Sequence, residues 1–518
     1  MAQPPAAAAG PPPMAGVTLA ITALALALGT FMQVLDTTIA NVSLPTIAGN
    51  LGVASDSSTW VITAFAVANG VAVPLTGWLM GRFGVVRTFL VSVALFTFAS
   101  FLCGIAWNLT SLIVFRVFQG ACSGPMVPGS QALLISIFPP EKRGTALGLW
   151  SMTTLVAPIM GPLLGGYISD NLHWSWIFLI NVPFGLISLA VCWRNLSSRE
   201  TPTRKLKIDQ VGLLMLVVWV GALQIMLDLG KNDDWFNSPR IVACAVIAAV
   251  VFLAWVIWEA TDANPAVNLQ LFRRRNFAIG SIAFSLGYAV FFANILILPL
   301  WTQTQLGYTA TWSGLIAAPG GLVAVVLTPF VARFMGRIDP RLFATFAFVT
   351  FAISYGMRAN FTTQTSLWQF IMPQLVQGAA MSCFFVSMLT ISLDGIPPER
   401  LPSATGLSNF TRITAGAFAA SLITTAWDRR EALHQSRLAE AIGSGEAGPY
   451  AHAAAALGRM GLNDAQTAAV VTRQMSGQGY LLASTDLFWL SSVCCLVLIV
   501  LVWFTRRPAA PTGPVAAD

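Results

Sequence analysis

Charged residues are scarce in this sequence. Only 9% of its 518 residues are Asp, Glu, Lys or Arg, whereas 56% are hydrophobic. A soluble domain carries about a quarter charged residues, because its surface has to be hydrated. The shortage of charge therefore excludes a water-soluble protein of this length. The net charge of +7 does not indicate nucleic acid, because the basic residues lie in short segments between apolar runs.

Signatures of metal binding and of catalysis are also missing. All seven cysteines lie inside apolar runs, and an odd number there argues against a disulfide framework or a zinc site. The sequence has no phosphate-binding loop of the Walker type, so ATP is not expected to be the direct energy source. We therefore expect no cofactor, no metal and no enzymatic activity. A membrane-bound enzyme would need a catalytic set outside the motifs described below.

What the sequence has instead is a series of apolar blocks. Each is about twenty residues long, the length with which an α-helix crosses a bilayer core of roughly 30 Å. Peptide groups find no water at that depth, so the blocks are expected to be helices. We predict an all-α integral membrane protein with fourteen spans, at about residues 16–40, 60–80, 88–107, 110–136, 145–168, 175–194, 210–229, 240–259, 277–301, 311–334, 342–361, 367–394, 404–427 and 484–505.

The positions of Lys and Arg predict the orientation of these spans. An even number of spans places both termini on one side of the membrane, and 18 of the 28 basic residues lie in the loops of that side. The short loops of the opposite side hold only three. By the positive-inside rule, both termini are then cytoplasmic. The first fifteen residues are a poor signal peptide, because no basic residue precedes the first apolar run.

An internal repeat divides the chain. The segments FQG (118–120) and PPEKRGTALG (139–148) recur as VQG (376–378) and PPERLPSATG (397–406), both at an offset of 258. Two parallel six-helix halves of this kind suit alternating access to a central site. The predicted parts are a disordered tail (1–15), an N-terminal half (16–195), a linker with two inserted helices (196–276), a C-terminal half (277–505) with a long outer loop (428–483), and a second tail (506–518).

Charged residues inside spans cost about 2.5–3.5 kcal/mol each to insert, and Asp36, Arg116 and Arg412 are the clearest examples. Asp36 is predicted to carry protons. Burial raises the pKa of a carboxyl group and a nearby arginine lowers it, so a move between these two environments would couple protonation to conformation. A static ion pair is the alternative. Gln119 and Gly120 share a helix face with Arg116, which predicts that Arg116 joins in proton coupling. Arg412 is predicted to contact an anionic substrate or an acidic partner, with helix packing or a lipid headgroup equally open.

Other polar residues inside spans are candidates for the substrate cavity, namely Asn41, Gln119, Gln224, Asn294, Gln377 and Asn409. Four charged residues fall at span ends, where the interface is expected to solvate them: Asp228, Glu259, Arg358 and Asp394.

The run APIMGPLLGG (157–166) combines prolines with small residues four positions apart. Small residues at this spacing allow helices to approach closely, and prolines bend a helix by removing backbone hydrogen bonds. This run is predicted to seal or pivot the bundle, with simple packing as the alternative.

These motifs together resemble the fourteen-span drug:proton antiporters of the major facilitator superfamily. LDTTIANVSLPTI (35–47) is similar to their first-span motif, and GWLMGRFGVVR (77–87) to the loop motif after span 2. RVFQG (116–120) is similar to the span-4 motif, and APIMGPLLGG (157–166) to the antiporter motif of span 5. The resemblance implies a major facilitator fold and roles for Asp36, Asn41, Pro45, Arg116, Gln119, Gly161, Pro162, Gly165 and Gly166.

The resemblance covers nearly the whole chain. It is strongest to the inner-membrane pump subunits of Gram-negative tripartite efflux systems. It implies proton-coupled export of hydrophobic drugs across the cell inner membrane, with a periplasmic adaptor (membrane fusion) protein and an outer-membrane channel as partners. A symporter or an exporter of one metabolite would use the same fold and is the alternative.

Two features remain open. Gly81 occupies the position at which the loop motif usually has Asp. Gating on the cytoplasmic side is therefore expected to depend on Arg82, Arg87 or other contacts. The loop 428–483 is either a lid or adaptor-docking element built of short helices, or a solvated connector.

Overall fold

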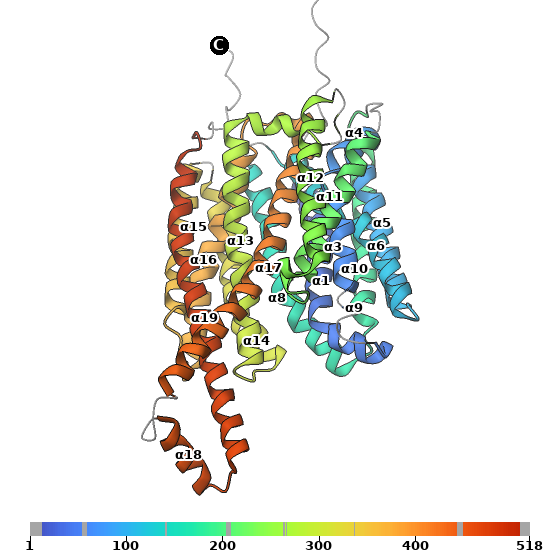
Figure 1. Ribbon diagram of the computed structural model, residues 1–518. Coiled ribbons are helices and arrows are strands. Elements are labelled where there is room, and N and C mark those ends of the chain that lie inside the picture. The colour runs from blue at the N-terminus through green and yellow to red at the C-terminus, as the bar shows by residue number, and fades with distance from the viewer. Residues whose placement is uncertain are drawn as a thin grey trace, which may run out of the picture.

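Helices are the only regular elements in the part of the chain that the computed structural model describes. This part comprises residues 13–53, 58, 60–139, 142–203, 209–262, 265, 267–335, 337–442 and 449–507. The helices form a bundle with both ends of the chain at one end and a helical hairpin projecting from the other (Figure 1). The all-α prediction is confirmed. Most of the two predicted tails, 1–15 and 506–518, falls outside the described residues.

The helices that precede residue 197 are called here the N-terminal group. They are α1 (Gly16–Leu51), α3 (Trp60–Ala72), α4 (Thr76–Phe83), α5 (Val85–Gly104), α6 (Leu109–Ser123), α7 (Met126–Ile137), α8 (Arg143–Asn171), α9 (Trp176–Leu179) and α10 (Asn181–Leu196). Proline, which lacks an N–H and breaks a helix, explains two interruptions. Pro74 lies between α3 and α4, which meet at 57°, and Pro125 lies between α6 and α7.

Two helices follow, α11 (Gln210–Leu229) and α12 (Pro239–Thr261), which pack against each other. The remaining elements are called the C-terminal group: α13 (Arg275–Thr304), α14 (Ala310–Phe334), α15 (Pro340–Arg358), α16 (Leu367–Ser392), α17 (Leu401–Ile442), α18 (Pro449–Arg459) and α19 (Asp464–Trp503). In Figure 1 the N-terminal group lies on the right and most of the C-terminal group on the left.

Packing within the two groups follows the sequence repeat. Helix α3 packs on α6 as α14 packs on α16, and α5 packs on α6 as α15 packs on α16. The groups meet along α8, which packs against α14 and α16, and at α4 and α7, which pack against α17. A few helices therefore form the interface between the groups. A movement of one group relative to the other would have to break the contacts between these helices.

Ten of the described helices are long and apolar enough to cross a membrane, or eleven if the bent pair α3–α4 is one span. The predicted count of fourteen is therefore not confirmed, although each predicted segment overlaps a helix or a helix pair. Three segments account for the difference. The break at Pro125 leaves α6 and α7 too short, and α15 and α17 are not apolar enough over a full span.

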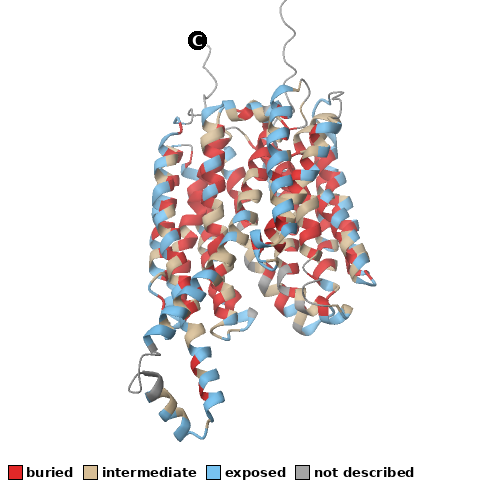
Figure 2. Cartoon of the chain, in the orientation of Figure 1, coloured by how far each residue is buried: buried red, intermediate tan, exposed pale blue. Residues whose placement is uncertain are grey.

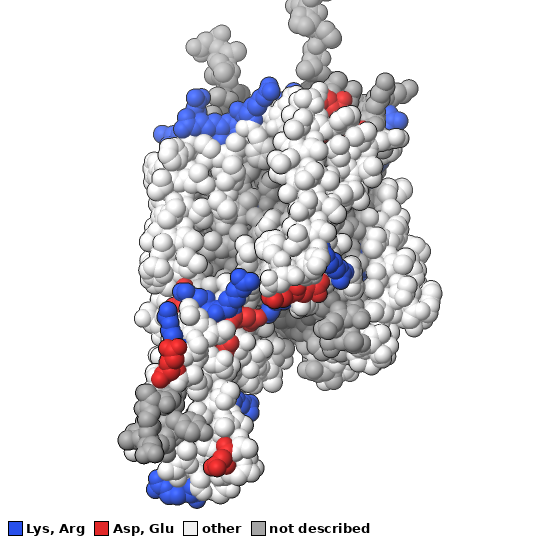
Figure 3. Space-filling view, viewed as in Figure 1, with Lys and Arg blue, Asp and Glu red and all other residues white. Residues whose placement is uncertain are grey.

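The outer wall of the bundle is apolar. Figure 2 shows buried residues facing the interior and exposed residues on the outside, and many of the exposed ones are large hydrophobics such as Leu253, Phe330 and Trp489. In Figure 3 Lys and Arg gather at the end where the termini lie, and a second band of charges lies where the hairpin begins. Between the two bands the face shown in Figure 3 carries almost no charge, as expected of a surface that contacts lipid.

The projecting hairpin corresponds to the predicted loop 428–483. It consists of the end of α17, α18 and the beginning of α19, so this segment is largely helical. Its role as a lid or a docking element remains a prediction.

Candidate functional site

Two opposite charges meet in the interior of the N-terminal group. Arg116 Nη1 on α6 lies 2.5 Å from Asp36 Oδ2 on α1, and the two side chains are 1% and 0% exposed. Removing one partner of a buried pair leaves an uncompensated charge and typically costs about 3–5 kcal/mol. The structure thus brings the two residues predicted for proton coupling into direct contact.

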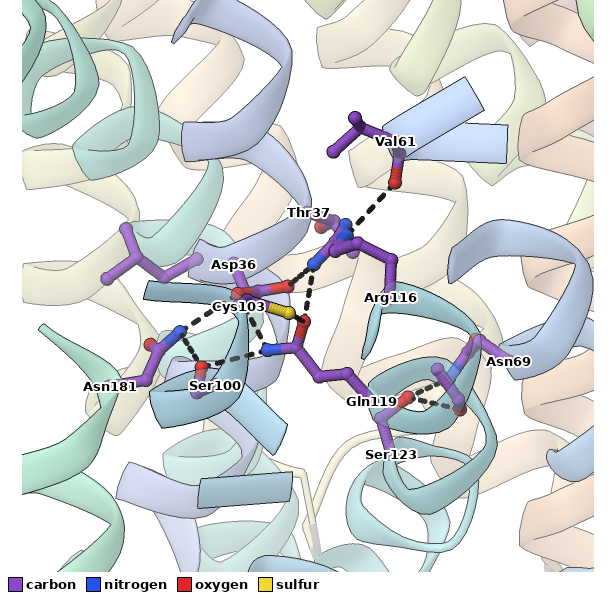
Figure 4. A network of polar contacts seen from close by, with 12 residues as sticks. Asp36, Thr37, Val61, Asn69, Ser100, Cys103, Arg116, Gln119, Ser123 and Asn181 are labelled. Atoms are coloured by element: carbon purple, nitrogen blue, oxygen red, sulfur yellow. Dashed lines mark hydrogen bonds and ion pairs between the residues drawn. The ribbon is translucent and has the colours of Figure 1, made fainter. Parts of the chain in front are cut away.

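Three neutral polar side chains extend this network, and the Cys103 thiol adds a weaker contact to Gln119 at 3.6 Å (Figure 4). Gln119 accepts a hydrogen bond from Arg116 Nη1 at 2.7 Å and donates to Asp36 Oδ1 at 3.1 Å. Asn181 donates to the same carboxylate oxygen at 2.9 Å, and both amides donate to Ser100 Oγ. All three are fully buried. Asn181 and Ser100 were not predicted from the sequence, although Asn181 is the amide inside the apolar run 175–194.

Arg116 has further partners that do not depend on Asp36. Its Nε donates to the carbonyl oxygen of Val61 at 3.0 Å, and its Cζ lies 4.2 Å from the centre of the Phe65 ring and 5.5 Å from that of Phe178. Cation–π contacts of this kind hold a guanidinium in place. Protonation of the carboxylate would therefore weaken the ion pair while the arginine kept its position.

The span-5 run packs directly behind Asp36. A Cβ on Gly161 of α8 would lie 2.1 Å from Thr38 Oγ1, and one on Gly165 would lie 3.1 Å from Ile39. Only glycine allows α8 to approach α1 this closely. Gly166 is also buried. The side chains of Pro162 and Asn41 lie outside the described residues.

A second buried arginine lies in the C-terminal group. Arg358, at the end of α15, is 1% exposed and donates hydrogen bonds to Gln377 Oε1 and, at 3.2 Å, to Gln374 Oε1. The rings of Tyr355 and Phe488 lie 5.4 and 5.9 Å from its Cζ. The expectation that the interface solvates Arg358 was wrong, because α15 turns this side chain into the bundle.

The repeat relates this region to the ion pair. The offset of 258 maps Asp36 onto Asn294 and Ser100 onto Arg358. Asn294 Nδ2 donates a hydrogen bond to Ser491 Oγ on α19 at 3.0 Å. In the N-terminal group, Asp36 likewise forms a hydrogen bond with the last helix of its group, through Asn181 of α10. The position of the acid is thus occupied by a neutral amide in the C-terminal group.

Asn409 and Arg412 lie where the two groups meet. Arg412 donates to Asn409 Oδ1 at 2.9 Å, and Asn409 donates to Gln131 Oε1 on α7 at 2.9 Å. Arg412 Cζ lies 4.5 Å from the Tyr288 ring and 6.0 Å from the Trp150 ring. With a side chain only 5% exposed, Arg412 does not contact lipid headgroups in this conformation.

The groups also touch at the end of the bundle that carries the termini. A Cβ on Gly77 of α4 would lie 2.4 Å from Ser403 Oγ of α17, and Thr405 Oγ1 donates to the Pro128 carbonyl oxygen at 3.3 Å. This end is therefore closed.

The arginines of the loop motif, Arg82 and Arg87, lie near this closed end. Arg87 Nε lies 3.9 Å from Glu200 Oε2, and among the described residues neither arginine forms an ion pair with the C-terminal group. Arg82 is half-buried, and the Arg87 side chain is 75% exposed. The acid at this turn is Glu200, which accepts hydrogen bonds from the backbone N–H groups of Val86 (3.0 Å) and Arg87 (2.8 Å). Glu200 thus caps the beginning of α5, which follows α4, the helix in which Gly81 replaces the Asp of the family motif. This role of Glu200 was not predicted from the sequence.

A cavity of about 150 Å³ adjoins the ion pair. It lies between α1, α3, α6, α11 and α17, and Phe65, Arg116, Trp219 and Gln224 are among its lining residues. Arg116 therefore touches both the carboxylate and the cavity. Of the predicted cavity residues, Gln224 lines it, whereas Gln119, Asn294, Gln377, Asn409 and Arg412 are buried in helix contacts elsewhere.

Comparison with known proteins identifies full-length relatives. Residues 26–420 match the family described as Major Facilitator Superfamily. The chain is 48% identical to the multidrug export protein EmrB of Haemophilus influenzae, over 96% of this chain and 98% of that protein. It is 46% identical to the fatty acid resistance protein FarB of Neisseria gonorrhoeae, with the same coverage.

A solved structure shows the same fold. The human organic anion transporter MFSD10 superposes with a TM-score of 0.56, covering 93% of this chain and 99% of that one, at 13% sequence identity.

Proposed function

Because the chain belongs to the major facilitator superfamily, we propose that it is a proton-coupled antiporter that exports hydrophobic drugs and toxic compounds across the cell inner membrane. Efflux is supported by relatives named as multidrug export proteins, which are similar over almost the whole chain. The apolar helices agree with a multi-span membrane transporter.

The observation that carries proton coupling is the buried pair Asp36–Arg116 beside the cavity. Protonation of Asp36 would remove the negative charge that balances Arg116, and Arg116 lines the cavity. The electrostatic environment of the cavity would then depend on whether the carboxyl holds a proton. Two ligands that change each other's affinity in this way are coupled reciprocally, as exchange of a proton for cargo requires.

We further propose the architecture in which this exchange takes place. Fourteen spans would form two six-helix halves, 16–195 and 277–505, with the inserted helices in 196–276. The closed end, which carries the basic residues and the termini, would face the cytoplasm. The structure would then correspond to a state that is sealed toward the cytoplasm.

The partners would be a periplasmic adaptor protein and an outer-membrane channel. The helical hairpin 428–483 projects on the side opposite the termini, where an adaptor would be reached (Figure 1). Replacing the hairpin by a short Gly/Ser linker is expected to abolish co-purification of an adaptor while membrane insertion is retained. Full co-purification would contradict docking at this site.

A susceptibility panel in a pump-deficient host tests the proposed function. Asp36→Asn is expected to abolish resistance to all cargo while the protein remains inserted in the membrane, with resistance compared at equal amounts of inserted protein. Asp464→Asn removes an exposed carboxylate from the hairpin and is expected to leave resistance unchanged. Resistance retained by Asp36→Asn would refute proton coupling through this residue. Proton-driven uptake by oriented vesicles would favour a symporter.

A further inference from the structure

Helix α11 carries a half-buried carboxyl group that the ion pair does not involve. Asp228, the second-last residue of this helix, accepts a hydrogen bond from Gln224 Nε2 at 3.0 Å through Oδ1. Thr63 of α3 is its other polar neighbour. Its second oxygen, Oδ2, is shielded from solvent and has no hydrogen-bond partner among the described residues. The expectation that the membrane interface solvates Asp228 was therefore wrong for this oxygen.

No described cation offsets the charge of Asp228. Helix α3 contributes no charged residue to this region. On the turn after α11, Lys231 pairs with Asp428 of α17 at 2.7 Å, and Asp233 pairs with Arg240 of α12 at 3.7 Å.

The remaining charges on the packing elements are either paired or lie elsewhere along them. Arg116, which lies across the cavity, forms an ion pair with Asp36. Glu259 lies near the end of α12, whereas Arg240 lies at its beginning. Arg412 lies on α17, 16 positions before Asp428, the partner of Lys231. A carboxylate buried without a cation is costly, so the neutral acid suits this site.

Asp228 lies where three parts of the fold meet. Its neighbour Leu227 accepts a hydrogen bond from Ser421 of α17 at 2.6 Å, and Trp235 Nε1 after the helix donates to Thr425 Oγ1 at 3.0 Å. These contacts fasten the end of α11 to the C-terminal group, whereas the carboxyl group faces Thr63 of the N-terminal group. A movement of one group relative to the other would therefore change the surroundings of Asp228.

We propose that Asp228 is a second proton-carrying carboxyl group, contributed by the inserted helix α11. It binds one H⁺ on Oδ2 in the sealed state and releases the same H⁺ when the N-terminal and C-terminal groups move relative to each other, so only an O–H bond forms and breaks. Gln224, which both binds the carboxyl and lines the cavity, links this proton to the cargo. The transport consequence rests on the proposed antiport, whereas the protonation itself does not.

Infrared spectroscopy of the purified full-length protein tests protonation independently of transport. The carbonyl stretching band of protonated carboxylic acids is expected to lose intensity in Asp228→Asn, relative to the wild-type protein and to Asp233→Asn on the neighbouring turn. An unchanged band in Asp228→Asn would overturn the proposal.

Chemical labelling of the wild-type protein gives the same information if the variant fails to fold. Dicyclohexylcarbodiimide, an apolar reagent that modifies protonated carboxyl groups, is expected to label Asp228 and to label it less at alkaline pH. Mass spectrometry that finds Asp228 unlabelled at every pH would contradict the proposal.

Transport in proteoliposomes distinguishes a proton site from a cargo contact. The probes are ethidium, a hydrophobic cation, and NBD-dodecanoate, a hydrophobic anion. For both, Asp228→Asn is expected to exchange one proton fewer per cargo molecule than the wild-type protein. Loss of ethidium transport alone, with the proton ratio for NBD-dodecanoate unchanged, would make Asp228 a cation-recognising residue and would overturn the proposal. If neither probe is transported by the wild-type protein, the proposed function fails, whereas the infrared result still decides the protonation.

Discussion

Substitution of Gly161 by Ala tests whether the contact between α8 and α1 positions the ion pair. The new Cβ would lie 2.1 Å from Thr38 Oγ1 and 2.6 Å from Thr38 Cβ, whereas ordinary contacts begin at 3.4 Å. The helices would have to separate locally by about 1.3 Å, the difference between 3.4 and 2.1 Å, and overpacking of this kind costs about 1–3 kcal/mol. Thr38 follows Asp36 by two residues, so the separation would also displace the carboxylate from Arg116.

The assay combines thermal unfolding in detergent with efflux by cells. Gly161→Ala is expected to lower Tm and efflux, and Thr38→Gly in the same chain is expected to restore part of both, because it removes the clashing atoms. Gly49→Ala, at a glycine of α1 with open space around it, is the matched control and should leave both unchanged. A Gly161→Ala protein with the Tm and efflux of the wild type would refute the close approach.

Three further predictions concern single contacts. Glu200→Gln is expected to destabilise the protein by about 1 kcal/mol, because the cap of α5 loses its charge; an unchanged Tm would contradict this role. Asn181→Ala is expected to reduce proton-driven efflux several-fold, whereas Asn195→Ala, on the same helix but remote from the pair, should not; equal effects would refute a specific contribution of Asn181. The Arg341 guanidinium lowers the pKa of the Asp339 carboxyl, so the stability that Asp339 contributes should be present near neutral pH and lost as the pH falls below about 4. The difference in Tm between the wild-type protein and Asp339→Asn should therefore vanish in acid, and a difference that persists there would contradict the ion pair.

Much of the fold was predictable, because hydrophobicity and charge are read along the chain. Each apolar block overlaps a helix or helix pair, and the basic loops predicted on the side of the termini agree with the gathering of Lys and Arg there. The number of spans was less predictable. Breaks such as the one at Pro125 divide an apolar run, and polar residues that face the interior lower the apolar character of α15 and α17.

The candidate site was predictable only in part. Asp36 and Arg116 stood out because charge inside an apolar span is costly. Asn181 and Ser100 did not, because neutral polar residues are common in spans and nothing local marks the few that meet a charge. Glu200 lies in a loop, where an acid is ordinary, and its capping role depends on how the chain returns to α5.

The sequence by itself determined that this protein is a helical membrane protein with a repeated architecture, since the cost of placing polar groups in lipid acts on each segment separately. Only the tertiary structure decided which polar groups meet. Asp36 contacts Arg116, which is 80 positions away in the sequence, and Asn181, which is 145 positions away. These contacts arise from helix packing rather than from proximity along the chain. The same packing buries Arg358 and shields Oδ2 of Asp228 from solvent, with no opposite charge beside either group among the described residues. Neither composition nor spacing could distinguish these two residues from residues at a solvated span end.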